Sequence, residues 1–196
     1  DGNSVNINYF NIDLNSSGAN ISPASANVVA GAGFGVAGVM TVFSPTCFQL
    51  GSGFIITDAG INSTFDLQAG ATLKFGGSIA SSGASGNIRT DIRTFPTTAS
   101  YGFTGSVTPQ SVGSGLPVSM VNMYIDKDLV TNRVLIAQNT VVTGNISLYL
   151  GKLDLNNFNL ELGTTSANGT VSNASVNSYV ITWDGSANGN LIHHVN

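Results

Sequence analysis

The chain has 196 residues, which is long enough for a domain with a substantial buried core. Only 8% of the residues are charged, with ten acidic residues against six basic ones, so few helical salt bridges can form and a helical bundle or coiled coil is excluded. The six basic residues are scattered along the chain, which argues against nucleic-acid binding because no stripe of Lys and Arg can neutralise several phosphates. The single cysteine excludes an intramolecular disulfide framework and a site of several cysteines around a metal.

The first strongly apolar segment runs from Val28 to Phe43 and raises the question of a membrane helix. It is about 16 residues long, against the roughly 20 that a membrane-spanning helix needs, and four glycines interrupt it. The segment therefore predicts buried strands and no membrane span. The chain begins with Asp1 and has no basic segment ahead of an apolar one, as expected of a mature or excised segment of a longer product.

Short strands with alternating apolar residues dominate the rest of the chain. The clearest run predicts three strands in succession, broken at Gly151 and at the pair Asn156–Asn157. Its six leucines keep one alternating phase, so we expect all of them to point into a single core. They are Leu148, Leu150, Leu153, Leu155, Leu160 and Leu162.

An apolar-Asp-Leu phrase followed by a turn and a second strand recurs along the sequence. It occurs at 12–14, 65–67 and 153–155. This internal repeat predicts an all-β fold, a parallel β-solenoid (β-helix) with short strands and Gly or Asn corners, in which each strand pairs with its equivalents above and below. At roughly 20 to 25 residues per coil we expect eight or nine coils. An antiparallel β-sandwich is the alternative fold.

Asparagine is expected at the corners, because it tolerates a left-handed backbone and can form hydrogen bonds along a stack. We divide the chain into an N-terminal apolar β region, 1–62, and a β-solenoid repeat region, 63–196, which we expect to be continuous as one domain.

Several phrases between Ser63 and Gly163 resemble one known family. They are STFDLQAGATLKFGG, SGASGNIRTDIRTF, YGFTGSVTPQSVGSGLP and VVTGNISLYLGKLDLNNFNLELG, followed by the segments 174–182 and 189–192. In these phrases and their order the chain is similar to a repeat region of large secreted, adhesin-like surface proteins of Bacteroidota that are exported by the type IX secretion pathway. The resemblance covers about two thirds of the chain, and residues 1–60 match only loosely.

The resemblance implies an extracellular or cell-surface location and a solenoid-like scaffold. In that family the sequence usually continues past the position of Asn196, so we expect this chain to belong to a larger architecture. The family pattern consists of turns and core positions, so the resemblance transfers no catalytic residues.

Few residues suit catalysis or metal binding. The two histidines, His193 and His194, are adjacent, and neighbouring side chains of a strand point to opposite faces, so we expect no joint metal site and no catalysis from them. Asp126 and Asp128 form a close pair with Lys127 facing away, in a segment best interpreted as a solvated loop, with weak calcium binding as the alternative. We therefore predict no catalytic, metal or cofactor site.

Three further features are weighed for binding. Arg89, Asp91 and Arg93 are expected on one exposed strand face opposite apolar neighbours, with a polyanion-binding groove as the alternative. Cys47 is expected to be a buried small hydrophobic residue, because it has no base beside it. Six aromatic residues could stack on sugars, and Tyr149 is the best of them because its flanking leucines should point inward. They are Tyr9, Tyr101, Tyr124, Tyr149, Tyr179 and Trp183.

The function expected from these observations is a non-enzymatic extracellular structural or adhesive module. A chain with so little charge should have surface that a partner covers, so we expect copies of the chain to self-associate into a fibre or stalk, or to bind the rest of a larger surface protein. The alternative is a carbohydrate-binding or polysaccharide-cleaving β-helix domain. The feature that would distinguish them is a groove with clustered acidic and aromatic side chains on one face.

Overall fold

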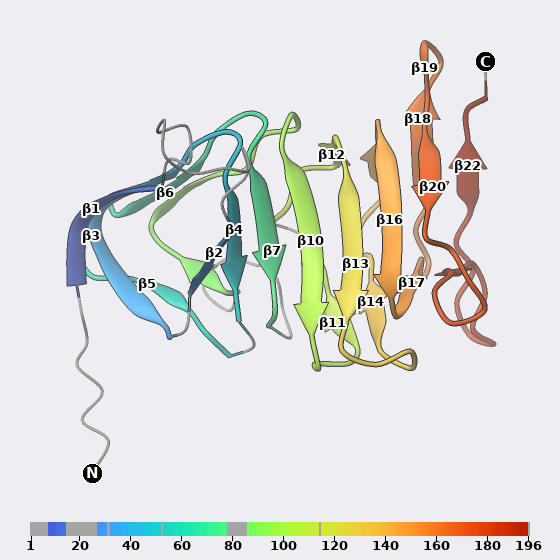
Figure 1. Ribbon diagram of the computed structural model, residues 1–196, viewed down its shortest axis with the longest axis horizontal. Helices are drawn as coiled ribbons and strands as arrows, with labels where there is room; N and C mark the ends of the chain where they lie inside the picture. The colour runs from blue at the N-terminus through green and yellow to red at the C-terminus, as the bar shows by residue number, and fades with distance from the viewer. Residues whose placement is uncertain are drawn as a thin grey trace.

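The fold is all-β, and its parallel sheets are stacked as a β-solenoid of about six turns. The computed structural model describes residues 8–14, 27–30, 32–51, 53–77, 86–113 and 115–195, and of residues 8–14 and 27–29 it describes the backbone. Figure 1 shows the strands side by side along the long axis of the molecule, with β1 (Asn8–Leu14) and β22 (Leu191–His193) at opposite ends. The expected solenoid is confirmed.

One sheet, here called sheet B, runs the full length of the stack. Its seven strands pair in sequence order and all in parallel. Partners in adjacent strands lie 20 residues apart at the closest (Asn27 and Cys47) and 28 at the farthest (Thr72 and Ser100). The strands are β2 (Asn27–Ala30), β4 (Cys47–Leu50), β7 (Thr72–Phe75), β10 (Ser100–Gly105), β13 (Met123–Lys127), β16 (Asn145–Leu150) and β20 (Thr170–Ser172).

From β10 onward each turn has three strands, because sheet B is followed by sheets C and D. Sheet C is β11 (Gln110–Ser111), β14 (Arg133–Leu135), β17 (Lys152–Asp154) and β21 (Val180–Ile181). Sheet D is β12 (Ser119–Met120), β15 (Thr140–Val142), β18 (Leu160–Thr164) and β22, with β19 (Ala167–Asn168) antiparallel to β18. The cross-section is therefore a triangle.

In the N-terminal turns a single sheet, sheet A, takes the place of sheets C and D. Its long strand β3 (Phe34–Val42) pairs with β1, and one half of it pairs with β5 (Ile56–Asp58) and the other with β6 (Thr64–Leu67). Those two strands pair in turn with β8 (Ile88–Arg89) and β9 (Ile92–Thr94). The apolar segment 28–43 thus forms strands, and within the described residues no helix has the length and hydropathy of a membrane span.

The number of turns, about six, is lower than the eight or nine expected. The expectation divided the whole chain into turns, whereas the paired strands of sheet B begin at Asn27 and end at Ser172. The apolar-Asp-Leu phrase does not mark one fixed face of the solenoid. Its copy at 65–67 begins in β6 of sheet A, whereas its copy at 153–155 begins in β17 of sheet C. The phrase encodes a strand, a corner and a second strand, and it recurs on different faces of the solenoid, so its spacing does not measure one turn.

The core is a continuous column of apolar side chains inside the sheets. Phenylalanines from neighbouring turns contact each other in it, as with Phe75 and Phe103, whose ring centroids are 6.1 Å apart. Five of the six leucines expected in one core lie there, all but Leu150. Leu150 is half-buried, because the pairing register shifts after Ile125 and places Leu150 opposite the outward-facing Asp126.

Asparagines occupy the corners as expected. The three non-glycine residues with positive φ in the described part of the chain are Asn62, Asn156 and Asn173, with φ between 52° and 62°. At another corner Asn190 donates a side-chain hydrogen bond to Asn159 Oδ1 of the previous turn, at 2.9 Å. Both roles of asparagine, the left-handed backbone and the hydrogen bond along the stack, are therefore present.

Candidate functional site

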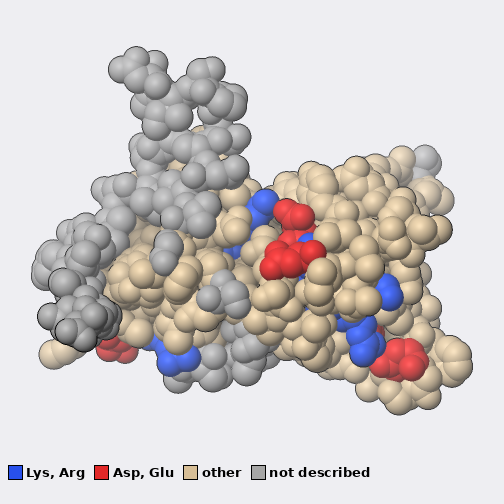
Figure 2. All heavy atoms as spheres, turned by 60° about the horizontal axis from the view of Figure 1, so that its bottom comes forward, with Lys and Arg blue, Asp and Glu red and all other residues tan. Residues whose placement is uncertain are grey.

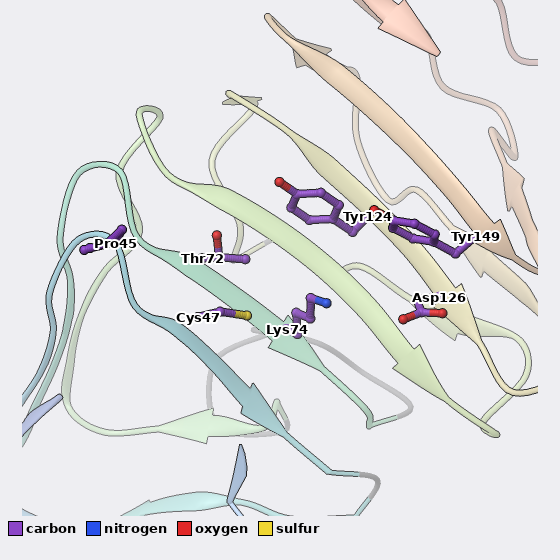
Figure 3. A pocket seen from close by; sticks show the side chains of 7 residues that line it. All are labelled: Pro45, Cys47, Thr72, Lys74, Tyr124, Asp126 and Tyr149. Carbon is purple, nitrogen blue, oxygen red and sulfur yellow. The ribbon is translucent and has the colours of Figure 1, made fainter. Parts of the chain in front are cut away.

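A pocket of about 350 Å³ lies on the outer face of sheet B (Figure 3). Strands β4, β7, β13 and β16 all contribute to its wall, so residues about 100 positions apart meet there. Alternation explains the arrangement, since Leu73 and Phe75 of β7 point into the core and leave Thr72 and Lys74 outside. The lining residues are Pro45, Cys47, Thr72, Lys74, Tyr124, Asp126 and Tyr149.

Gly102 makes room for the Lys74 side chain on this face. It lies in β10, between Lys74 of β7 and Tyr124 of β13, and pairs in register with both. A Cβ atom at this position would lie 2.8 Å from Lys74 Cγ and 3.3 Å from Tyr124 Cβ. Because glycine has no side chain, the Lys74 amine reaches across β10 and lies 5.7 Å from the centre of the Tyr124 ring.

Tyr149 is the most accessible aromatic residue of the pocket, with 54% of its surface exposed. It is the extra residue at the register shift between β13 and β16, where Ile125 pairs with Leu148 but Asp126 pairs with Leu150. Tyr124 and Tyr149 line the same part of the pocket together with Asp126 (Figure 3). The outward orientation expected of Tyr149 is confirmed.

Cys47 of β4 lines the same pocket, on the side opposite Tyr149 of β16, and is 8% exposed. Burial raises the pKa of its thiol, although the Lys74 ammonium opposes this effect. Cys47 is thus buried as expected, but it lies on the outer side of sheet B rather than in the central core.

The segment Asp126 to Asp128 is not the solvated loop that the sequence predicts. Asp126 and Lys127 are the last two residues of strand β13, and the alternation that exposes Asp126 turns Lys127 into the interior, where it is 2% exposed. Lys127 Nζ donates hydrogen bonds to Thr104 O at 2.7 Å and to Gln110 Oε1 at 2.6 Å. Burial lowers the pKa of Lys127 to about 8, although Asp128 opposes the shift.

A second pocket of about 350 Å³ adjoins this segment and shares Asp126 with the first. Asp128 and Gln49 line it as well. Lys127 also lines it, but the Lys127 amine is bonded to Gln110, which is itself fully buried. The Lys127 amine is therefore already engaged in buried hydrogen bonds, and the groups that this pocket presents to a ligand are chiefly the two carboxylates.

The structure separates the two histidines. His193 Nε2 lies 2.8 Å from Gly169 O, and His194 Nε2 lies 2.7 Å from Glu161 Oε1. Within the residues that the structure describes, no group of three His, Cys, Asp or Glu side chains could hold a metal ion.

The expected charged face at Arg89, Asp91 and Arg93 is formed only in its first half. Arg89 and Asp91 are exposed, and Ile88 and Thr90 are buried, but the pattern fails at Ile92 and Arg93. The chain bends at Thr90 and Asp91, so two short strands replace the single one, and Ile92 is 49% exposed instead of facing the core. Arg93 pairs with the inward-facing Phe65, and it donates to Ile88 O at 3.3 Å. The corner between β8 and β9 therefore reverses the alternation on which the expectation depended.

The remaining aromatic candidates lie apart from the pocket. Tyr101 is fully buried in the core and donates a hydrogen bond to Pro96 O at 2.9 Å, and burial raises the pKa of its hydroxyl. Tyr179 lies under the amine of Lys152, which is 5.1 Å from the centre of its ring, and Trp183 is exposed near the C-terminal end. The side chain of Tyr9 lies outside the described residues.

Sequence reasoning missed Gly102 and the buried role of Lys127. The Lys127 role could have been found from the strict alternation of Met123, Ile125 and Lys127. Gly102 carries no such signal, because only the pairing of β10 with β7 and β13 shows which side chains it separates. Comparison with known proteins adds nothing to this geometry, since no protein family, curated protein or solved structure matches the chain.

Proposed function

We propose that this chain is a non-enzymatic structural or adhesive module of the cell surface, whose copies associate end to end into a fibre or stalk. One observation carries the proposal: the last turn of the solenoid continues the core in register but leaves it uncovered. Val171, Val180 and Leu191 pair with Ile146, Leu153 and Leu160, which are all fully buried. Val171 and Leu191 are each 38% exposed.

The strand edges at both ends of the stack support the same proposal. Among the described residues, β20, β21 and β22 each pair only with the preceding turn, and β1 and β2 each pair with one strand. Unpaired edges of parallel strands are templates for another strand. A second copy placed head to tail would continue the parallel pairing and cover the exposed apolar side chains.

The sparse charge of the chain supports association as well. Figure 2 shows a face on which charged side chains are few and lie in small groups of mixed sign, with uncharged residues between the groups. Like-charge repulsion between copies is therefore weak, at a formal net charge of −4 over 196 residues. The extracellular location belongs to the proposal through the resemblance of residues 63–163 to secreted adhesin-like proteins.

A polysaccharide-cleaving or carbohydrate-binding domain is the second candidate. The pocket on sheet B favours binding, since it combines two tyrosines with Lys74 and Asp126. Cleavage is less well supported, because the first pocket is lined by one carboxylate and the amine beside the second pocket is buried.

End-to-end association is tested by placing a charge on the open end. Leu191→Lys introduces an ammonium where a second copy would bury a leucine, so we expect it to abolish the larger species that the unmodified chain forms as its concentration rises. Ile61→Lys is the matched control, because Ile61 is 91% exposed and lies between β5 and β6, which pair with strands on both sides and so belong to neither open end. Sedimentation velocity and electron microscopy measure the species and their shape.

Filaments or stacked oligomers that Leu191→Lys abolishes and Ile61→Lys preserves support the proposal. It is refuted if the unmodified chain remains a monodisperse monomer at high concentration, or if Leu191→Lys associates as well as the unmodified chain does. Circular dichroism establishes that both variants keep the β fold.

A further inference from the structure

We infer that the pocket on the outer face of sheet B binds an uncharged oligosaccharide built of pyranose rings, with Tyr149 as the stacking platform. This inference deepens the adhesive role proposed above by naming a ligand class. It concerns the side of the solenoid, whereas the proposed association concerns its ends, so either can fail without the other.

The exposed Tyr149 ring is the first argument. A tyrosine that projects from a register shift presents its ring to a ligand, whereas the ring of a regular strand position packs against cross-strand neighbours. A pyranose ring has an apolar face of C–H groups and a polar rim, which suits a rigid aromatic side chain with a polar tip. Tyr124 extends the aromatic surface beside Tyr149.

The position of Lys74 over Gly102 is the second argument. Because Gly102 has no side chain, the Lys74 side chain crosses β10 toward Tyr124, and a Cβ at Gly102 would force Lys74 to move. The pocket of about 350 Å³ lies at the small end of the range of ligand sites, about 300 to 1,000 Å³. A single sugar ring with part of its neighbour fits a site of this size.

The polar groups around the pocket are the third argument, because they favour a ligand without net charge. Lys74 of β7 and Asp126 of β13 both line the pocket and contribute one positive and one negative charge. In the described part of the chain, no hydrogen bond or ion pair engages the Asp126 carboxylate. Sugar hydroxyls can donate to Asp126 and accept from Lys74 at once, while an acidic sugar would meet repulsion from Asp126.

The test is isothermal titration of the protein with neutral oligosaccharides of glucose, galactose, mannose and xylose, with polygalacturonate oligomers as the acidic comparison. We expect saturable binding of at least one neutral oligosaccharide. Tyr149→Ala should weaken this binding about tenfold or more, because it removes the stacking surface. Gly102→Val should weaken it similarly, because the valine side chain would displace Lys74 from its position over β10. The backbone of Gly102 is one that valine can adopt.

The matched control is Tyr179→Ala. Tyr179 also lies under a lysine amine, at 5.1 Å from Lys152, but on sheet C and outside the pocket, so its removal should leave binding unchanged. Leu191→Lys should likewise bind normally, and Tyr149→Ala should associate normally, which separates this inference from the proposed assembly. The inference is overturned if polygalacturonate alone binds, or if no neutral oligosaccharide binds. It is also overturned if Tyr149→Ala and Gly102→Val bind as tightly as the unmodified chain.

Discussion

The inner turns and the last turn of the solenoid contain the same kind of residue in very different surroundings. Leu160 of β18 and Leu191 of β22 are paired in register on sheet D. Leu160 is fully buried, whereas Leu191 is 38% exposed. The next turn, which contains β22, covers Leu160, whereas no described strand of sheet D follows β22 to cover Leu191.

This difference shows that burial in a solenoid depends on neighbours along one direction. Each turn contacts the turn before it and the turn after it, so stability is close to a sum of repeat and interface contributions. An alternating strand is therefore necessary for a core position but not sufficient. The position of the strand in the stack decides whether its apolar face is covered.

The largest expected effect is the loss of stability on truncating Leu160, and truncating Leu191 is the matched comparison. Leu160→Ala should lower the free energy of unfolding by about 3 kcal/mol, because it removes buried methyl groups and leaves a cavity between two turns. Leu191→Ala should cost less than about 1 kcal/mol under dilute conditions, since its side chain is already partly in water. Urea unfolding followed by circular dichroism measures both values.

Protein concentration sharpens this comparison. If copies stack end to end, Leu191 becomes buried in the assembly, so the cost of Leu191→Ala should grow with concentration while that of Leu160→Ala stays constant. Equal costs for the two variants in dilute solution would contradict the idea that the last turn is uncovered.

The fold was largely predictable because the strands in the best segment obey a simple rule. The strands at 145–150, 152–154 and 160–164 follow directly from alternating leucines and from Gly151 and Asn156, whose positive φ values suit those residue types. The number of turns was not predictable in the same way. Steps along sheet B range from 20 to 28 residues, and one long strand, β3, pairs with both β5 and β6 in the N-terminal turns, so the sequence has no fixed period to count.

The candidate site was predictable only in part. Tyr149 could be found from its leucine neighbours, but one of these, Leu150, is only half-buried because of the register shift that also exposes Tyr149. Gly102 and Asp126 become part of the same site only through pairing between strands more than 20 residues apart. Alternation fixes the side of the sheet that a residue faces, while the register across turns fixes its neighbours.

The second expected effect concerns the charge that an inner turn buries. The pKa of Lys127 is lowered to about 8, from 10.5. Between these two pH values the unfolded chain holds a proton that the folded chain has released, so stability rises with pH, by up to about 1.4 kcal/mol per pH unit. The free energy of unfolding of the unmodified chain should therefore rise between pH 8 and pH 10 relative to that of Lys127→Met.

Lys152→Met is the control for this pH dependence. Lys152 lies at the surface against Tyr179, so its removal should leave the pH profile parallel to that of the unmodified chain. Parallel profiles for Lys127→Met and the unmodified chain would mean that Lys127 is not buried as a charged amine.

The smallest expected effect compares two corners that have the same residue and the same backbone. Asn156 follows strand β17 inside the stack, and Asn173 follows strand β20 in the last turn, with φ values of 52° and 59°. Alanine in the left-handed region costs about 1 kcal/mol, so Asn156→Ala should lower stability by about that amount. Asn173→Ala should cost less, because the last turn can open without unfolding the rest. In both corners glycine should be tolerated, which separates backbone strain from loss of the asparagine side chain.

Hydrogen exchange of the amides in each turn measures the two losses of stability separately. A larger loss for Asn173→Ala than for Asn156→Ala would show that the last turn is as firmly held as the inner ones.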